Sequence, residues 1–161
     1  QPNLLTCKQT CTNLGDEPMP YYAGFHPYFL TPLAQKDQIL VDFKAIARKQ
    51  YNEALTDIIG ELPALALPAA VSDQKLNEQL SILKENITHL SFPDGLNVEM
   101  LINGIEREDM FKFVQMYTQK EMPFFCIEPW MNFPNALNHK TEMINLESKS
   151  TESAQLFIKI S

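Results

Sequence analysis

Cysteine is scarce in this sequence, and the few residues present do not predict a disulfide framework. The 161-residue chain has three cysteines, Cys7, Cys11 and Cys126, and an odd, small number argues against a disulfide-stapled fold. Cys7 and Cys11 stand four residues apart in a stretch typical of a strand, which is not the spacing of a zinc knuckle. The three histidines are also scattered, with no HxH or HxxxH pair. The sequence therefore predicts no metal site.

Positive charge and long apolar runs are lacking as well. The net charge is −7, and only Arg48 and Arg107 supply guanidinium groups. This argues against nucleic acid as a partner, because phosphate contacts need clustered Lys and Arg. The longest apolar candidate, LPALALPAA, is too short to cross a bilayer and contains two prolines. No signal peptide is visible, so we expect a cytoplasmic protein without a membrane contact.

Apolar and polar residues alternate along much of the chain. In LNVEMLI (96–102), Leu96, Val98, Met100 and Ile102 share one face, which is typical of a half-buried strand. Similar patterns occur in QILVDFKA (38–45), DMFKFVQMYT (109–118), EMPFFCIE (121–128) and QLFIKI (155–160). Eleven prolines and turn signals such as PDGL (93–96) divide the chain into short pieces, as in sandwiches and barrels. We expect one mostly-β unit over residues 1–161.

One segment departs from this alternation. SDQKLNEQLSILKEN places Leu76, Leu80 and Leu83 at helical spacing, with Ser72 or Asp73 available as an N-cap. Residues 72–87 therefore form either a short helix or an irregular excursion between strands.

One histidine lies among glycine, proline and aromatic residues in GFHPYF (24–29). His26 follows Gly24 and precedes Pro27, which biases it toward an extended conformation, and aromatic rings surround it. Imidazole ordinarily titrates near neutrality, so a histidine on a stiff, apolar-walled edge can exchange protons with a bound molecule. The alternative is a structural histidine that is hydrogen-bonded inside an aromatic corner. His89 and His139 have polar surroundings and carry no proposed role.

One glutamate lies among aromatic residues and proline in FFCIEPWMNFPNALN (124–138). In a strand, Phe124, Cys126 and Glu128 point the same way. A carboxylate beside apolar groups is costly to bury, and such surroundings raise its pKa and strengthen it as a base. Trp130 would suit the apolar face of a sugar ring. The alternative is that Glu128 merely begins an exposed loop.

The two motifs together resemble a known family. NLGDEPMPYYAGFHPYF (13–29) is similar to the segment of the aldose 1-epimerase (galactose mutarotase) superfamily that carries a catalytic histidine. FFCIEPWMNFPNALN is similar to the segment that carries the catalytic glutamate. INLESKSTESAQLFIKI (144–160) resembles the closing strands that follow, without the usual Pro-Gly. The order of all three agrees with the family.

This resemblance implies a fold, an activity and a set of site residues. The implied fold is the mostly-β galactose-mutarotase supersandwich. His26 would be the general acid toward the sugar ring oxygen, and Glu128 the general base toward the anomeric hydroxyl. Tyr28 and Trp130 would stack against the sugar, and no cofactor or metal is needed. The implied activity is interconversion of the α and β anomers of a free hexose.

The chain also departs from the family. The family domain is considerably longer, so the chain, which begins at Gln1, resembles only its C-terminal portion. Many members bind sugar hydroxyls through an aspartate, and Thr88 in THLSF stands in its place. Because half a sandwich exposes long sheet edges, we expect either a separate chain that supplies the N-terminal half or self-association. Two alternatives remain: epimerisation of a hexose 6-phosphate, or a carbohydrate-binding module without turnover.

Overall fold

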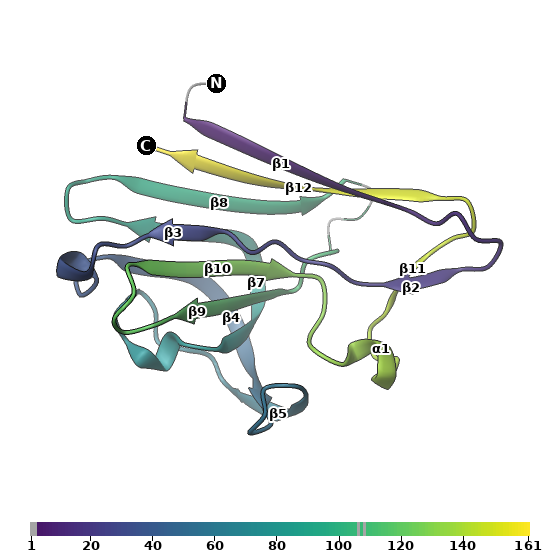
Figure 1. The fold of residues 1–161 in the computed structure, drawn as a ribbon, viewed down its shortest axis with the longest axis horizontal. Helices are drawn as coiled ribbons and strands as arrows, with labels where there is room; N and C mark the ends of the chain where they lie inside the picture. Colours follow the sequence, from purple (N-terminus) through teal and green to yellow (C-terminus); the bar gives the residue numbers. More distant parts are fainter. Residues whose placement is uncertain (1–2, 106, 108) are drawn as a thin grey trace.

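The computed structural model describes residues 3–105, 107 and 109–161, and nearly all regular structure in these residues is antiparallel β-sheet (Figure 1). Within the described residues one sheet has ten strands, and seven of them lie side by side in the order β1-β12-β8-β7-β9-β10-β3. Their bounds are Leu4–Thr12 (β1), Thr151–Ile160 (β12), Asn97–Gly104 (β8), Gln79–Ser91 (β7), Phe113–Thr118 (β9), Phe124–Trp130 (β10) and Tyr28–Leu30 (β3). β4 (Leu40–Tyr51) pairs with β7, β5 (Ile58–Pro63) and β6 (Ala69–Ala70). A smaller sheet pairs β2 (Met19–Tyr21) with β11 (Ile144–Leu146).

The prediction of a mostly-β fold is confirmed. Each of the five segments predicted as strands contains one: β4, β8, β9, β10 and β12. The stretch with Cys7 and Cys11 forms β1, and both cysteines are half-buried on one face of it. Period-two patterning identified β4, β8 and β12, whereas β9 and β10 are buried on both faces and were recognised by their aromatic and β-branched residues.

β7 connects the two halves of the large sheet. Its residues Ile87–Ser91 pair with β8, and its residues Gln79–Ile82 pair with β9. β4 pairs with the other edge of β7 along both of these stretches, and the register of this pairing shifts near Ala45. Such irregularities let a sheet bend. The curled sheet encloses one main apolar core, whose members include Val41, Leu90, Met100, Val114, Phe125 and Leu156. Burying each such side chain stabilises the fold by about 1.5–3 kcal/mol.

The segment 72–87 is mostly strand, not helix. Only Gln74–Leu76 are helical, as a 3-10 turn, and the carboxylate of Asp73 caps this turn by accepting a hydrogen bond from the backbone N–H of Lys75 at 2.9 Å. Glu78 then takes a left-handed backbone angle, φ 55°, and β7 begins at the next residue. Leu80 and Leu83 lie in β7 because strand partners on both sides outweigh a weak helical spacing.

Two further features frame the site. The 3-10 turn at Leu33–Gln35 precedes Lys36, whose buried ammonium donates to oxygens of the turn between β9 and β10. The short helix α1 (Ala136–His139) follows β10 and packs in a second apolar cluster with Leu80, Phe113 and Phe133. In the described part of the chain, no helix is long and apolar enough to cross a membrane.

Candidate active site

The loop before β3 brings His26 to the end of β10. Gly24 forms an isolated bridge with Trp130, and the N–H of Phe25 donates to the carbonyl of Pro129 at 3.0 Å. A Cβ atom on Gly24 would lie 2.6 Å from Cδ1 of Trp130 and 2.9 Å from the carbonyl oxygen of Pro129. The close approach of the two backbones therefore requires glycine at this position.

His26 and Glu128 meet at the end of β10. The Nε2 atom of His26 lies 3.2 Å from Oε1 of Glu128. The Glu128 side chain is 2% exposed, whereas the His26 side chain is 50% exposed. Burial raises the pKa of Glu128 to about 7, and a hydrogen bond with the Trp130 side chain acts in the opposite direction. A carboxyl group with such a pKa can accept and return a proton near neutral pH.

Tyr28 lies against the imidazole. Its ring is stacked on that of His26, with centroids 4.9 Å apart and 10° between the planes. The Tyr28 ring also contacts the ring of Phe124 edge-on, with the two centroids 5.2 Å apart. The imidazole of His26 is therefore held between the Glu128 carboxylate and an aromatic ring, although half of its side chain remains open to solvent.

The thiol of Cys126 lies beneath this pair. Donor atoms of His26, Cys126 and Glu128 lie within 4.8 Å of one another, a spacing that a divalent cation could bridge. Burial is the main cause that raises the pKa of the Cys126 thiol to about 12. Burial therefore favours the protonated form of the thiol.

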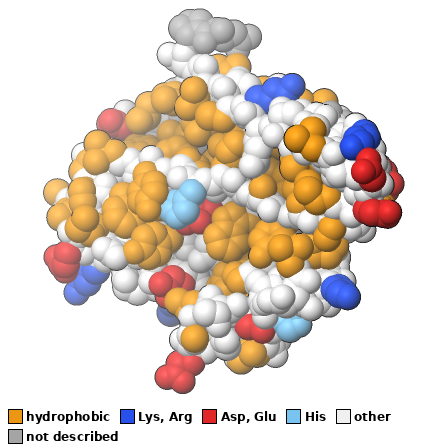
Figure 2. Space-filling view, turned by 45° about the vertical axis from the view of Figure 1, so that its right-hand side comes forward, with side chains coloured by type: hydrophobic (Ala, Val, Ile, Leu, Met, Phe, Trp, Pro, Cys, Tyr) orange, Lys and Arg blue, Asp and Glu red, His pale blue; other side chains and the backbone are white. Residues whose placement is uncertain are grey.

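The pair opens into a cleft of about 300 Å³. Figure 2 shows this face, where a histidine and an acidic side chain meet in a hollow among apolar side chains. The cleft is lined by His26, Tyr51, Leu55, Glu78, Gln115, Tyr117, Glu128, Trp130 and Pro134. Its volume is at the lower end of the range for small-molecule sites. Aromatic walls with a few polar groups suit a sugar ring.

Three polar residues of the cleft were missed in the sequence. The hydroxyl of Tyr51, at the end of β4, donates a hydrogen bond to Oε1 of Gln115 at 2.9 Å. Gln115 lies in β9, directly opposite Glu128 of β10. Burial and the charges of Glu128 and Glu78 raise the pKa of Tyr51, so the hydroxyl remains a donor. Glu78 supplies a second carboxylate. Only Gln115 could have been noticed in the sequence. It is an amide within a mostly apolar strand, and a buried amide needs a hydrogen-bond partner.

Thr88 lies elsewhere. It is buried in β7 opposite Phe43 and Met100, on the same face as Leu90, so it points into the main core. It does not line the cleft, and its hydroxyl oxygen has no hydrogen-bond partner among the described residues. The motif placed Thr88 at the sugar, whereas the residue near this strand that lines the cleft is Glu78, immediately before β7.

Comparisons with known proteins agree on the fold. No family model and no curated protein matches the sequence. Among solved structures, the Slr1438 protein from Synechocystis sp. PCC 6803 matches with a TM-score of 0.77 and 24% identity over 100% of this chain and 52% of its own. A proposed aldose 1-epimerase from Escherichia coli K12 matches with a TM-score of 0.76 and 18% identity over 99% of this chain and 56% of its own. A second proposed aldose 1-epimerase, from Klebsiella pneumoniae, matches with a TM-score of 0.65 and 12% identity over 98% of this chain and 43% of its own.

These matches bear out the resemblance at the level of the fold. The chain spans about half the length of the solved structures that it matches. Because sequence identity is below 25%, these structural matches establish only the fold. Any activity must be argued from the residues of the site. The assignment of this half as a single C-terminal unit stays a prediction. The chain thus has the fold of about half of an aldose 1-epimerase-like protein.

Proposed function

We propose that this chain carries the acid–base pair of an aldose 1-epimerase, which interconverts the α and β anomers of a free hexose. The observation that carries this proposal is the 3.2 Å contact between Nε2 of His26 and Oε1 of Glu128 at the base of the cleft. The anomeric hydroxyl and the ring oxygen of a sugar are bonded to the same carbon. An acid and a base that serve both oxygens must therefore reach the same anomeric centre, as two neighbouring side chains at one end of the cleft can.

The reaction needs two proton transfers. Glu128 takes the proton of the anomeric hydroxyl while His26 gives one to the ring oxygen, so that the bond between the anomeric carbon and the ring oxygen breaks and an aldehyde forms. The aldehyde rotates about the bond between its first two carbons. Closure on the other face reverses both transfers and inverts the anomer. Each well-placed transfer accelerates the reaction by roughly 10²–10⁴-fold.

The other cleft residues would bind the sugar. Trp130 and Tyr117 offer aromatic faces to the ring, and the carboxylate of Glu78 accepts hydrogen bonds from hydroxyl groups. Gln115 is fixed by its bond from Tyr51 and by the bond that its amide donates to the carbonyl of Met116 at 3.2 Å. An amide with a fixed orientation discriminates between hydroxyl positions, because a misplaced partner leaves it unpaired.

The charges of the cleft favour a neutral sugar over a hexose 6-phosphate. Among the described residues, the lining of the cleft holds two carboxylates, Glu78 and Glu128, and neither lysine nor arginine. An adjoining hollow contains Arg48 and Lys49, but Lys49 pairs with Glu61 at 2.6 Å. Phosphate recognition normally uses charge-assisted bonds from such cations. A hexose-6-phosphate epimerase and a non-catalytic sugar-binding module remain the alternatives.

A partner is part of the proposal. β1 forms the edge of the sheet and pairs only with β12 among the described strands, with Leu4 and Leu5 exposed on it. An edge of this kind invites a further strand. The chain also spans only about half of the structures it matches. We therefore expect a second polypeptide or self-association, and light scattering of the purified chain would detect the latter.

Polarimetry tests the activity directly. Freshly dissolved α-D-glucose or α-D-galactose should reach anomeric equilibrium faster with the chain, and Glu128→Gln should abolish the acceleration. Glu85→Gln is the matched control, because Glu85 is exposed and pairs with Lys44 outside the cleft. No acceleration by folded chain, alone or with an N-terminal half supplied in trans, would refute the proposed activity and favour the binding module.

A further inference from the structure

Two loops that are distant in the sequence wall the cleft. Residues 52–57 join β4 to β5 and contribute Leu55 to its lining. Residues 131–140 follow β10, include α1 and contribute Pro134. Both loops rest on one apolar cluster, in which Ile58 packs with Phe133 and Ala136.

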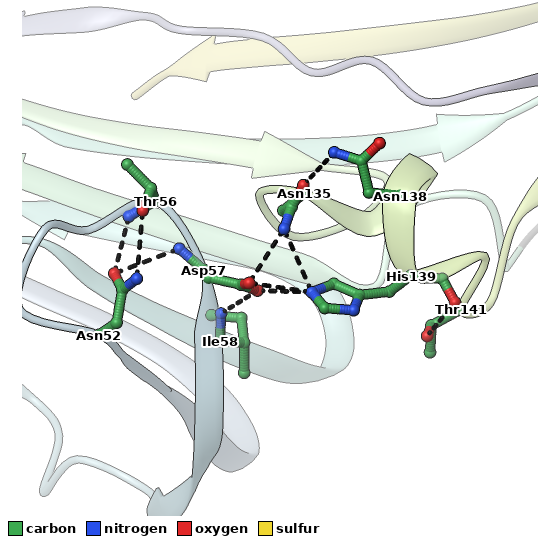
Figure 3. A network of polar contacts seen from close by, with 8 residues as sticks. All are labelled: Asn52, Thr56, Asp57, Ile58, Asn135, Asn138, His139 and Thr141. Atoms are coloured by element: carbon green, nitrogen blue, oxygen red, sulfur yellow. Dashed lines mark hydrogen bonds and ion pairs between the residues drawn. The ribbon is translucent and has the colours of Figure 1, made fainter.

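A polar cluster joins these loops (Figure 3). Oδ1 and Oδ2 of Asp57 lie 2.8 and 3.0 Å from Nε2 of His139. The amide of Asn135 donates to Oδ2 of Asp57 at 2.9 Å and lies 3.3 Å from the same imidazole nitrogen. Hydrogen bonds from Asn135 and then His139 lower the pKa of Asp57, which remains a carboxylate and an acceptor for both.

Each loop is stiff within itself. Oδ1 of Asn52 accepts bonds from the N–H groups of Thr56 at 2.9 Å and Asp57 at 3.3 Å. On the other side, Asn135 has a left-handed φ of 66°, and the N–H of His139 donates to its carbonyl at 3.2 Å. Leu55 and Pro134 therefore move with the residues that join the loops.

We propose that Asp57, Asn135 and His139 form a clasp, a set of positioning residues that holds the two loops together and thereby fixes Leu55 and Pro134 at the entrance of the cleft. As far as sugar binding is concerned, this inference rests on the proposed function. His139 is 46% and Asp57 27% exposed, so the clasp is held by a solvent-accessible ion pair of modest strength. It sets the entrance without being needed for folding.

Hydrogen exchange of the whole chain tests the clasp without any need for activity. In His139→Ala, the amides of Leu55 and Thr56 should exchange about two- to fivefold faster, although their own hydrogen bonds are intact. Asn135→Gly keeps the left-handed backbone and removes the amide, so it should produce a similar effect. The effects should not add in the double variant, because one unit is being broken. His89→Ala, on a strand away from the cleft, is the control.

Kinetics with the sugar that the chain turns over provide the second readout. His139→Ala should raise KM by about two- to fivefold and leave kcat within about twofold, since no reacting atom is touched. Unchanged exchange of Leu55 and Thr56 would overturn the clasp. Faster exchange with an unchanged KM would overturn its role at the entrance. If the parent chain turns over neither sugar, the proposed function fails, whereas the exchange experiment still decides whether the clasp exists.

Discussion

The ring of Tyr28 lies parallel to the ring of His26, with their centroids 4.9 Å apart. Tyr28 is 60% exposed and is not among the residues that line the cleft. Its ring contacts the imidazole and Phe124, and its side chain is also hydrogen-bonded with that of Cys126. This position suits a ring that orients the imidazole of the proposed acid, and stacking of Tyr28 on the sugar stays a prediction from the sequence.

Tyr28→Ala distinguishes these two roles. A stacked pair contributes about 0.5–1.5 kcal/mol, so loss of the ring should lower kcat about three- to tenfold with little change in KM. Tyr28→Phe keeps the ring and should retain most of the activity. Steady-state anomerisation kinetics measure both constants. A raised KM with an unchanged kcat would instead identify Tyr28 as a surface for the sugar.

The raised pKa of Glu128 predicts an acid limb in the pH dependence of activity. A base must be ionised to accept a proton, and burial raises the pKa of this carboxyl to about 7. kcat/KM should therefore fall as the pH decreases through about 7, approaching about tenfold per pH unit. Rates measured from pH 5 to 9 test this. A limb centred near 4.5 would mean that the carboxyl is solvated.

Gly24→Ala should damage the site through the backbone. The new Cβ would overlap Trp130 and the carbonyl oxygen of Pro129, so the loop that carries His26 must move. We expect a loss of about 1–3 kcal/mol in the free energy of unfolding and a kcat lower by roughly ten- to a hundredfold. Gly60→Ala is the control, because its Cβ would meet only the flexible Gln50 side chain, whose nearest atom is Oε1 at 3.2 Å. Equal effects of both substitutions would argue against a special role for Gly24.

Lys36→Met should destabilise the turn that leads into β10. The buried ammonium donates to Oγ1 of Thr118 at 2.8 Å, to the carbonyl of Gln119 at 2.9 Å and to that of Met122 at 3.0 Å. Methionine fills the space but leaves these oxygens without a donor, at a cost of about 2–4 kcal/mol. Urea unfolding measures the change. Lys44→Met, which breaks an exposed pair with Glu85, should cost about 1 kcal/mol or less, and a similar loss in both variants would contradict the argument.

Local pattern was sufficient for the strands and for the two central side chains. Strand alternation depends only on which face of a short segment is buried, so β8 and β12 were predictable. His26 and Glu128 were predictable because glycine, proline and aromatic residues surround each of them within a few positions. Their contact was expected only through the resemblance to a family.

The rest of the site depended on long-range pairing. Thr88 looked like a sugar ligand in its short motif, but its position in β7 directs it into the core beside Leu90. Glu78 and Tyr51 gave no local signal, and neither did the contact of Asp57 with His139. The sequence by itself determined the strands and marked His26 and Glu128 as candidate site residues, since these follow from residue type and short spacing. Only the tertiary structure decided which other side chains share the cleft, because the curl of the sheet around β7 brings together strand ends and loops that are far apart in the chain.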